Sequence, residues 1–208
     1  MIFESSRTSV NATDPDRPVA AAAGQGPGLP DASHSASIAA TRQSVLLLAE
    51  NNDMALAEAL KSLQSRVGQE IHTSDWLTID QPMISDFASA TRDKQWIHVD
   101  PARAATESPY GKTIAHGYLT LSLYPFLRGL VDSGTPLAPG VKRVINYGIN
   151  KLRFPNAVVV GSRIRAHCKL VSAQEAKGSL ELIEEYTVEI AGQDRPACVA
   201  ECIMRLYF

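Results

Sequence analysis

The feature that most constrains the fold is a helix-like apolar run from His116 to Val131. Its sequence, "HGYLTLSLYPFLRGLV", is apolar on almost every side of a helical projection. A helix of that composition belongs in the interior of a domain. The run therefore predicts a long central helix, with a kink at Pro125 because proline removes one backbone donor.

After this run the hydrophobic period changes to two. Residues 163–170, 180–190 and 197–207 alternate apolar and polar positions, which is typical of strands with one buried face. The turns "AKGS" and "AGQDR" between them predict an antiparallel meander. A further strand over 143–154 changes its apolar phase, which indicates a bulge near Gly148 or Asn150. Together these patterns predict an α+β fold, an antiparallel sheet wrapped around a central helix.

The rest of the chain divides into three parts. Residues 1–42 are rich in Ala, Gly, Pro and Ser, and we expect a disordered or weakly ordered extension because they bury little apolar surface. Residues 43–67 contain an amphipathic helix that leads into the domain. The domain itself covers 68–208, with a short strand at 75–80, a helix from 81 to about 93, and an ordered crossing segment with a helical turn at "PARAA".

Composition excludes several classes of protein. The chain has 208 residues, 45 % of them hydrophobic, and a formal net charge of −2, so it can bury a core and lacks the basic stripe of a nucleic-acid binder. Its three cysteines, Cys168, Cys198 and Cys202, fall at inward strand positions and are interpreted as reduced core residues. We see neither metal-ligand spacing nor a secretory or membrane-spanning segment, and we expect a cytoplasmic protein that does not bind membranes.

The chemistry centres on "TRDKQWIHVD", residues 91–100. Asp93 closes a predicted helix and His98 follows five positions later. Acidic residues commonly end turns, and a histidine between apolar neighbours is commonly a core residue. The functional alternative is that both side chains reach one water molecule as an acid/base pair.

His116 and Gly117 begin the central helix. The first amide N–H groups of a helix have no intrahelical partner and point toward any nearby oxyanion, so Gly117 is a candidate oxyanion donor. The structural alternative is close packing, which glycine also permits.

The segments "FASATRDKQWIHVDPARA" and "SPYGKTIAHGYLTLSLYPFL" resemble the MaoC-like (R)-specific enoyl-CoA hydratases, in particular their nodulation-protein-N-like branch. The resemblance covers roughly residues 68–208. It implies a hot-dog fold and a homodimer whose sheets pair edge to edge. It also implies an enzyme without a cofactor, whose substrate is an acyl thioester of coenzyme A or acyl carrier protein.

The same resemblance implies roles for individual residues. Asp93 and His98 would activate the water that adds to a trans-2-enoyl thioester, giving a (3R)-hydroxyacyl product, and the Gly117 N–H would bind the thioester oxygen. His116 and Ser122 are candidate substrate-binding residues, although a serine in this place also suits helix packing. The sequence departs from the family pattern at Arg92, where the motif has glycine.

Two alternatives remain open on the sequence. A hot-dog thioesterase would use the same helix N-terminus to polarise a thioester for hydrolysis. A dimer that binds acyl thioesters without turnover would keep the fold alone. The Asp93/His98 pair favours the hydratase, because hydrolysis does not require both members.

Overall fold

The computed structural model describes residues 32–131, 134 and 136–208, and side chains from residue 41 onward. It falls into two units, residues 1–44 and 45–208, of which the second holds the sheet and every candidate site residue. Its helices are α1 (Ala32–Gln64), α2 (Gln81–Thr91), α3 (Trp96–Val99), α4 (Pro101–Glu107), α5 (Gly117–Ser122) and α6 (Tyr124–Leu127). Its strands are β1 (Glu70–Thr73), β2 (Leu77–Thr78), β3 (Arg143–Arg153), β4 (Arg163–Glu175), β5 (Leu180–Ile190) and β6 (Cys198–Tyr207).

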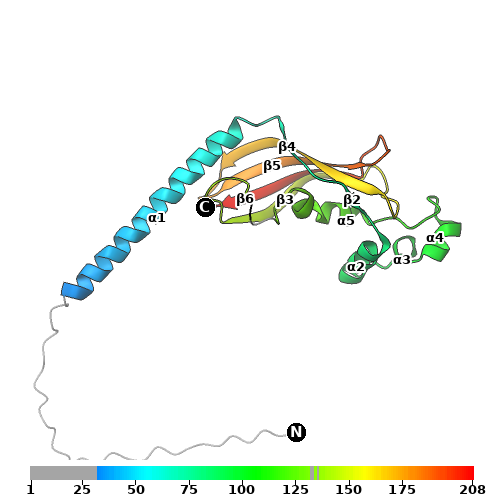
Figure 1. Cartoon of the computed structure of the whole chain (residues 1–208), viewed down its shortest axis with the longest axis horizontal. Coiled ribbons are helices and arrows are strands. Elements are labelled where there is room, and N and C mark those ends of the chain that lie inside the picture. Colours follow the sequence, from blue (N-terminus) through cyan, green and yellow to red (C-terminus); the bar gives the residue numbers. More distant parts are fainter. Residues whose placement is uncertain (1–31, 132–133, 135) are drawn as a thin grey trace, which may run out of the picture. The chain divides into compact units, whose positions relative to one another are not determined.

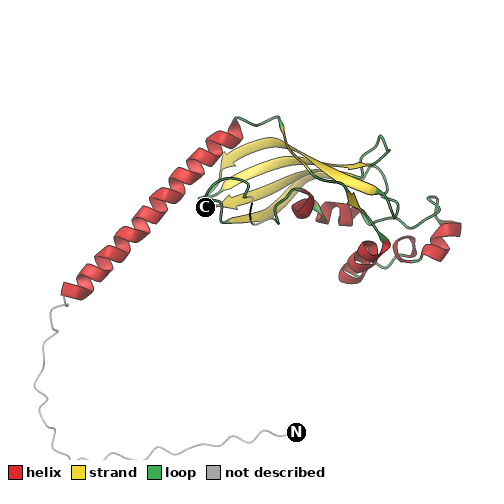
Figure 2. Cartoon of the chain, in the orientation of Figure 1, coloured by secondary structure: helices red, strands yellow, loops and turns green. Residues whose placement is uncertain are grey.

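The strands form one antiparallel sheet in the order β1-β4-β5-β6-β3, with β2 also paired to β4 (Figures 1 and 2). The meander predicted from the period-two segments is therefore β4-β5-β6. Along β4, β5 and β6 the buried positions alternate with more exposed ones, so one face of the sheet packs on the core and the other meets solvent. The short α5 lies against the inner face of the sheet (Figure 1).

The predicted bulge in the first long strand is confirmed. The register of β3 against β6 shifts twice, between Asn146 and Gly148 and between Ile149 and Lys151. Each shift inserts one extra residue, which reverses the apolar phase of the strand. This explains why β3 could be found from its sequence although its alternation is irregular.

The central helix differs from the prediction. In place of one helix over 116–131, the structure has α5 and α6, separated at Leu123. Pro125 has no N–H to give to Leu121, and the chain turns at this point. Gly129 then takes a left-handed conformation (φ 74°) and ends the segment. The helical segment is consequently shorter than its apolar run.

One helix extends beyond its predicted limits, and two short elements were not predicted. Helix α1 begins at Ala32, within the stretch expected to be weakly ordered, and residues 1–31 of that stretch lie outside the described residues. Strand β1 and helix α3 had no clear sequence signal, whereas α4 coincides with the helical turn expected at "PARAA".

A buried ion pair fixes the end of α6 to the sheet. Arg128 donates from Nε to Glu184 Oε2 (2.7 Å) and from Nη2 to Oε1 (2.9 Å), and the Tyr124 hydroxyl donates to the same Oε2 (3.0 Å). Glu184 is fully buried, at an inward position of β5 between Leu182 and Tyr186. Because the carboxylate accepts three hydrogen bonds, its desolvation is compensated.

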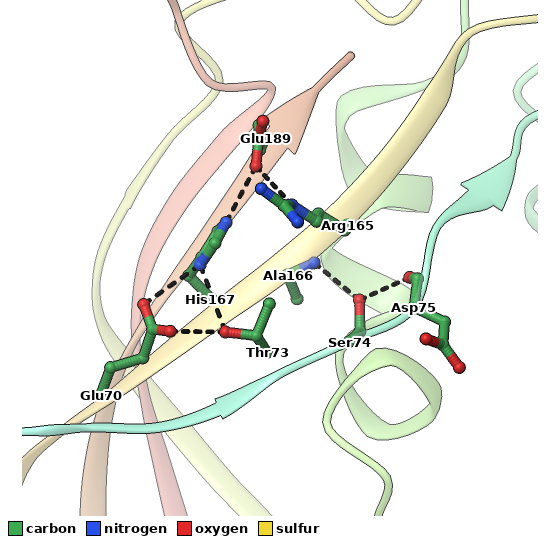
Figure 3. Close-up of polar contacts among 8 residues, drawn as sticks. All are labelled: Glu70, Thr73, Ser74, Asp75, Arg165, Ala166, His167 and Glu189. Carbon is green, nitrogen blue, oxygen red and sulfur yellow. Dashed lines mark hydrogen bonds and ion pairs between the residues drawn. The ribbon is translucent and has the colours of Figure 1, made fainter.

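A polar cluster on the outer face attaches β1 to the sheet (Figure 3). His167 of β4 contacts Glu70 of β1 through Nδ1 (3.1 Å) and Glu189 of β5 through Nε2 (2.9 Å). Arg165 donates to the same Glu189 oxygen (2.6 Å), and the Thr73 hydroxyl donates to Glu70. The cluster therefore joins three neighbouring strands by side chains as well as by the backbone ladder.

Candidate active site

Asp93 lies just beyond the end of α2. That helix is capped at its start by Asp80, whose carboxylate accepts from the Met83 N–H (2.9 Å), and it is followed by Arg92 in a left-handed conformation (φ 68°). The turn at Arg92 carries Asp93 away from the helix axis. Gln95 donates to the Asp93 carboxylate from its side-chain amide (3.2 Å), and the carboxylate remains partly exposed.

His98 is on the short helix α3, and its ring has a defined orientation. Nδ1 lies 2.8 Å from the carbonyl oxygen of Ile114, which can only accept, so Nδ1 carries the hydrogen. Nε2 consequently carries the lone pair and is free to act as a base. The backbone is also held, because the Gln81 amide donates to the His98 carbonyl (2.8 Å) and the Thr113 hydroxyl donates to the Gln81 oxygen (2.6 Å).

The surroundings of His98 also affect its charge. Burial lowers the pKa of His98, which is only 8 % exposed, and the adjacent His116 lowers it further. The bond to Ile114 and the Asp93 carboxylate act in the opposite direction without reversing the net shift. The lowered pKa favours the unprotonated ring at neutral pH, which is the state a general base needs.

The structure brings Asp93, His98 and His116 together. One ligand-type atom from each lies within 4.8 Å of the others. The His98 and His116 rings are stacked, with centroids 3.7 Å apart and planes 26° apart. A carboxylate oxygen of Asp93 and a ring nitrogen of His98 are thus close enough to contact the same water molecule, and the acid/base roles of the two residues stay a prediction.

Gly117 lies beside this cluster and is the first residue of α5. His98, His116 and Gly117 line one cavity of about 420 Å³, together with Thr120 and Phe154. The Phe154 ring covers Gly117 so closely that a Cβ at residue 117 would lie 2.7 Å from Phe154 Cδ2. The Gly117 N–H has no intrahelical acceptor, because it opens the helix.

Ser122 is not part of this cavity. Its side chain is exposed and donates to the Tyr118 carbonyl (2.7 Å), so we leave it out of the site. The helix turn facing the cavity presents Thr120 instead, whose hydroxyl donates to the Gly117 carbonyl (2.6 Å).

Several lining residues had no signal in the sequence. Tyr110, Asn156 and Arg195 line the same cavity, and they come from three separate loops. Gln81, 17 residues before His98, holds the His98 carbonyl, and Thr113, 15 residues after His98, holds the Gln81 side chain. These residues are polar, but polar residues are common in loops, so they point to a functional role only when the fold is known to bring them together.

The three clustered side chains are also the set in the described chain whose spacing suits a metal ion. Their orientation suits it less well. Lone pairs of an imidazole lie in the ring plane, and two rings stacked face to face direct their lone pairs side by side, not toward a common point. The arrangement fits proton transfer better than metal coordination.

The cysteines offer no alternative nucleophile. All three are buried and unpaired. Burial raises the pKa of Cys198 to about 11 and of Cys202 to about 12, so both remain thiols near neutral pH.

A family model described as "MaoC like domain" matches residues 62–191. The chain belongs to the MaoC-like family. It is 47 % identical over 149 residues to 3-hydroxyacyl-thioester dehydratase Z of Mycobacterium tuberculosis, covering 71 % of this chain and 95 % of that protein. It is 45 % identical over 152 residues to nodulation protein N of Rhizobium leguminosarum, covering 72 % of this chain and 92 % of the relative.

Solved structures agree on the fold. An (R)-hydratase from A. caviae aligns with a TM-score of 0.53 at 26 % identity, covering 67 % of this chain and 96 % of that one. An R-hydratase from Pseudomonas aeruginosa in the unliganded form aligns with a TM-score of 0.52 at 23 % identity, over 68 % and 81 % of the two chains. The predicted hot-dog fold is confirmed, and membership of a hydratase/dehydratase family supports a hydro-lyase activity. No helix in the described part of the chain has the length and apolar character of a membrane span.

Proposed function

We propose that the protein is an (R)-specific enoyl-thioester hydratase, which interconverts a trans-2-enoyl thioester and a (3R)-hydroxyacyl thioester. The observation that carries the proposal is the Asp93/His98 pair, in which a carboxylate oxygen and a ring nitrogen lie within 4.8 Å of each other. Of the two residues, His98 lines the cavity that Gly117 also lines. The names of the dehydratase and (R)-hydratase relatives support the reaction class and its stereochemistry.

The residues suggest the following proton movements. His98 Nε2 takes a proton from water as the water oxygen bonds to C3 of the enoyl group. The electrons of the C2–C3 double bond shift through C1 onto the thioester oxygen, and the Gly117 N–H donates a hydrogen bond to the enolate oxygen that results. A proton from the Asp93 carboxyl then reaches C2, and return of the His98 proton to Asp93 completes a net addition of water. An oxyanion donor of this kind contributes about 3 to 4 kcal/mol to the transition state.

The test is a hydration assay over a series of trans-2-enoyl-CoA substrates of increasing chain length. We expect the parent to consume the enoyl group and to release (3R)-hydroxyacyl-CoA. Asp93→Asn and His98→Ala should each lower kcat by about 10² to 10⁴ while remaining folded. Release of free thiol without hydration would indicate a thioesterase, and binding without turnover at every length would indicate a non-catalytic acyl-thioester protein; either result would overturn the proposal.

We further propose that Arg195 contacts a phosphate of the thioester carrier. Its side chain is exposed and lines the cavity that His98 lines. The β3 cations Arg143, Lys151 and Arg153 do not line this cavity. Of those, Lys151 pairs with Glu201. Arg195→Ala should raise KM for crotonyl-CoA about fivefold, or about 1 kcal/mol, with kcat unchanged. The control substrate is the crotonyl thioester of N-acetylcysteamine, which has no phosphate. For this substrate, Arg195→Ala should leave KM unchanged.

We also infer a homodimer that pairs β3 of one protomer with β3 of its partner. Strand β3 ends the sheet, and it exposes Ile145, Tyr147 and Ile149 along its length. A long apolar edge strand is unusual on a free monomer surface. Sedimentation should give a dimer for the parent, and Ile149→Lys should shift it toward the monomer.

A further inference from the structure

The ring of His116 is enclosed on both sides. It stacks on His98 and lies tilted against Phe87, with centroids 5.0 Å apart and planes 53° apart. Only 3 % of the residue is exposed. His116 also lines the cavity, so the substrate-binding role expected from the sequence stays a prediction, but most of its ring contacts other side chains.

The polar contact of His116 reaches the loop that carries Asp93. Its Nε2 lies 2.9 Å from the Asp93 carbonyl oxygen, and since a carbonyl only accepts, Nε2 carries the hydrogen. In the described residues, the other hydrogen bonds of Asp93 are made with its neighbours in the chain: its N–H donates to the Thr91 hydroxyl (3.4 Å), and its carboxylate accepts from the Gln95 amide (3.2 Å). The bond from His116 is both shorter and the one that joins Asp93 to a distant part of the fold.

We propose that His116 is a positioning residue that sets Asp93 and His98 at their working distance. It holds Asp93 through the backbone carbonyl and holds the His98 ring by stacking, so one side chain bears on both partners. The inference rests on the proposed hydratase function. It also explains why His116 directly precedes Gly117. In this position, the start of α5 fixes the proposed acid, base and oxyanion donor relative to one another.

Two variants separate the two contacts. His116→Gln keeps an amide donor near the position of Nε2 but loses the flat ring, whereas His116→Phe keeps a ring against His98 but loses the donor. If the bond to Asp93 matters for catalysis, His116→Phe should lower kcat on the order of 10²-fold with little change in KM, since displacement of a catalytic group by about 1 Å has effects of that size. His116→Gln should retain more of the activity, and Ser122→Ala serves as a control outside the site.

The pH profile provides a readout that a purely structural role would not move. Because His116 contributes to the lowered pKa of His98, the acidic limb of kcat/KM should move to higher pH in His116→Gln, toward the ordinary histidine value of 6.5. An unchanged kcat and an unchanged limb in folded His116→Phe and His116→Gln would overturn the proposal.

A second measurement needs no variant and no substrate. Nitrogen-15 NMR of histidine-labelled full-length protein distinguishes the two neutral tautomers. We expect the Nδ1–H form for His98 and the Nε2–H form for His116. The opposite tautomer at His116 would overturn the proposal even if the variants did not fold. Absence of hydratase activity in a parent with the expected tautomers would instead count against the proposed function.

Discussion

At the scale of single residues, the conformation of Arg92 explains a departure from the family pattern. The residue is left-handed (φ 68°), as is common for the position that follows a helix, and glycine adopts this conformation without steric cost. The glycine of the family motif is therefore a backbone requirement of the turn before Asp93. Arg92 meets the same requirement at a cost of about 1 to 2 kcal/mol.

Arg92→Gly should accordingly stabilise the protein. We expect a gain of about 0.5 to 1 kcal/mol in the free energy of unfolding, since relief of the left-handed strain exceeds the extra chain entropy of glycine. Urea denaturation of the variant and the parent measures this gain in the free energy of unfolding. Lys177, the other non-glycine residue with positive φ in the described chain, is a matched control far from the site, and Lys177→Gly should give a gain of similar size. A loss of stability in Arg92→Gly would show that its side chain makes a compensating contact.

Gly117 is required for a different reason, namely the close approach of Phe154. A methyl group at residue 117 would lie 2.7 Å from Phe154 Cδ2 and 2.8 Å from Cγ, and Cγ is near the backbone and cannot move freely. Gly117→Ala should destabilise the fold by about 1 to 3 kcal/mol and lower kcat by displacing the N–H that we propose as the oxyanion donor. Adding Gly117→Ala to Phe154→Ala should lower Tm much less than Gly117→Ala lowers it in the parent, because the ring that clashes with the new methyl group is gone. If the single variant matches the parent in both Tm and kcat, the ring moves without cost.

At the scale of elements, the limits of sequence reasoning follow from how far apart the interacting residues are. The strands β4, β5 and β6 could be predicted because alternation is a local pattern. Asp93 and His98 could be singled out because they lie only five positions apart in the sequence. Gln81, Thr113 and Arg195 reach the site through tertiary contacts that no local pattern encodes. A kink at Pro125 was predicted, but the length of the central helix was overestimated, because apolar composition indicates burial and not helix length.

The interruption between α5 and α6 makes the buried ion pair important to this region. Arg128 follows the last residue of α6, and its bonds to Glu184 are what fix that end of the helix to β5. Glu184→Ala leaves the Arg128 cation buried without a partner and should cost about 3 to 5 kcal/mol. Chemical denaturation of the variant measures the loss.

A double variant provides the matching control for this prediction. Arg128→Met with Glu184→Leu removes both charges and fills similar volume, so it should be closer to the parent in stability than Glu184→Ala. If the double variant lost as much stability as the single one, the pair would contribute through its hydrogen bonds to Tyr124 and not through mutual neutralisation.

At the scale of the whole molecule, the sheet has one edge closed by the short β1 and the other formed by the long β3. The edge at β1 depends on the cluster in Figure 3, in which Glu70 and Glu189 flank His167. The Thr73 hydroxyl and then His167 lower the pKa of Glu70, and hydrogen bonds from His167 and Arg165 lower the pKa of Glu189. Both carboxylates are thus more acidic in the folded chain than the ordinary glutamate value of 4.5.

This difference predicts how stability depends on pH. A carboxylate whose pKa is depressed by folding stabilises the fold above its unfolded pKa, and that stabilisation is lost as the pH falls through the folded pKa. Tm should therefore decline as the pH falls below about 4.5, by a modest amount because both side chains are substantially exposed and screened. Glu189→Gln should flatten this decline, and Thr73→Val should flatten it less, since it removes only the hydroxyl bond to Glu70. High salt should weaken the dependence in the parent. A decline of equal slope in the parent and in Glu189→Gln would show that the acid sensitivity arises elsewhere in the fold.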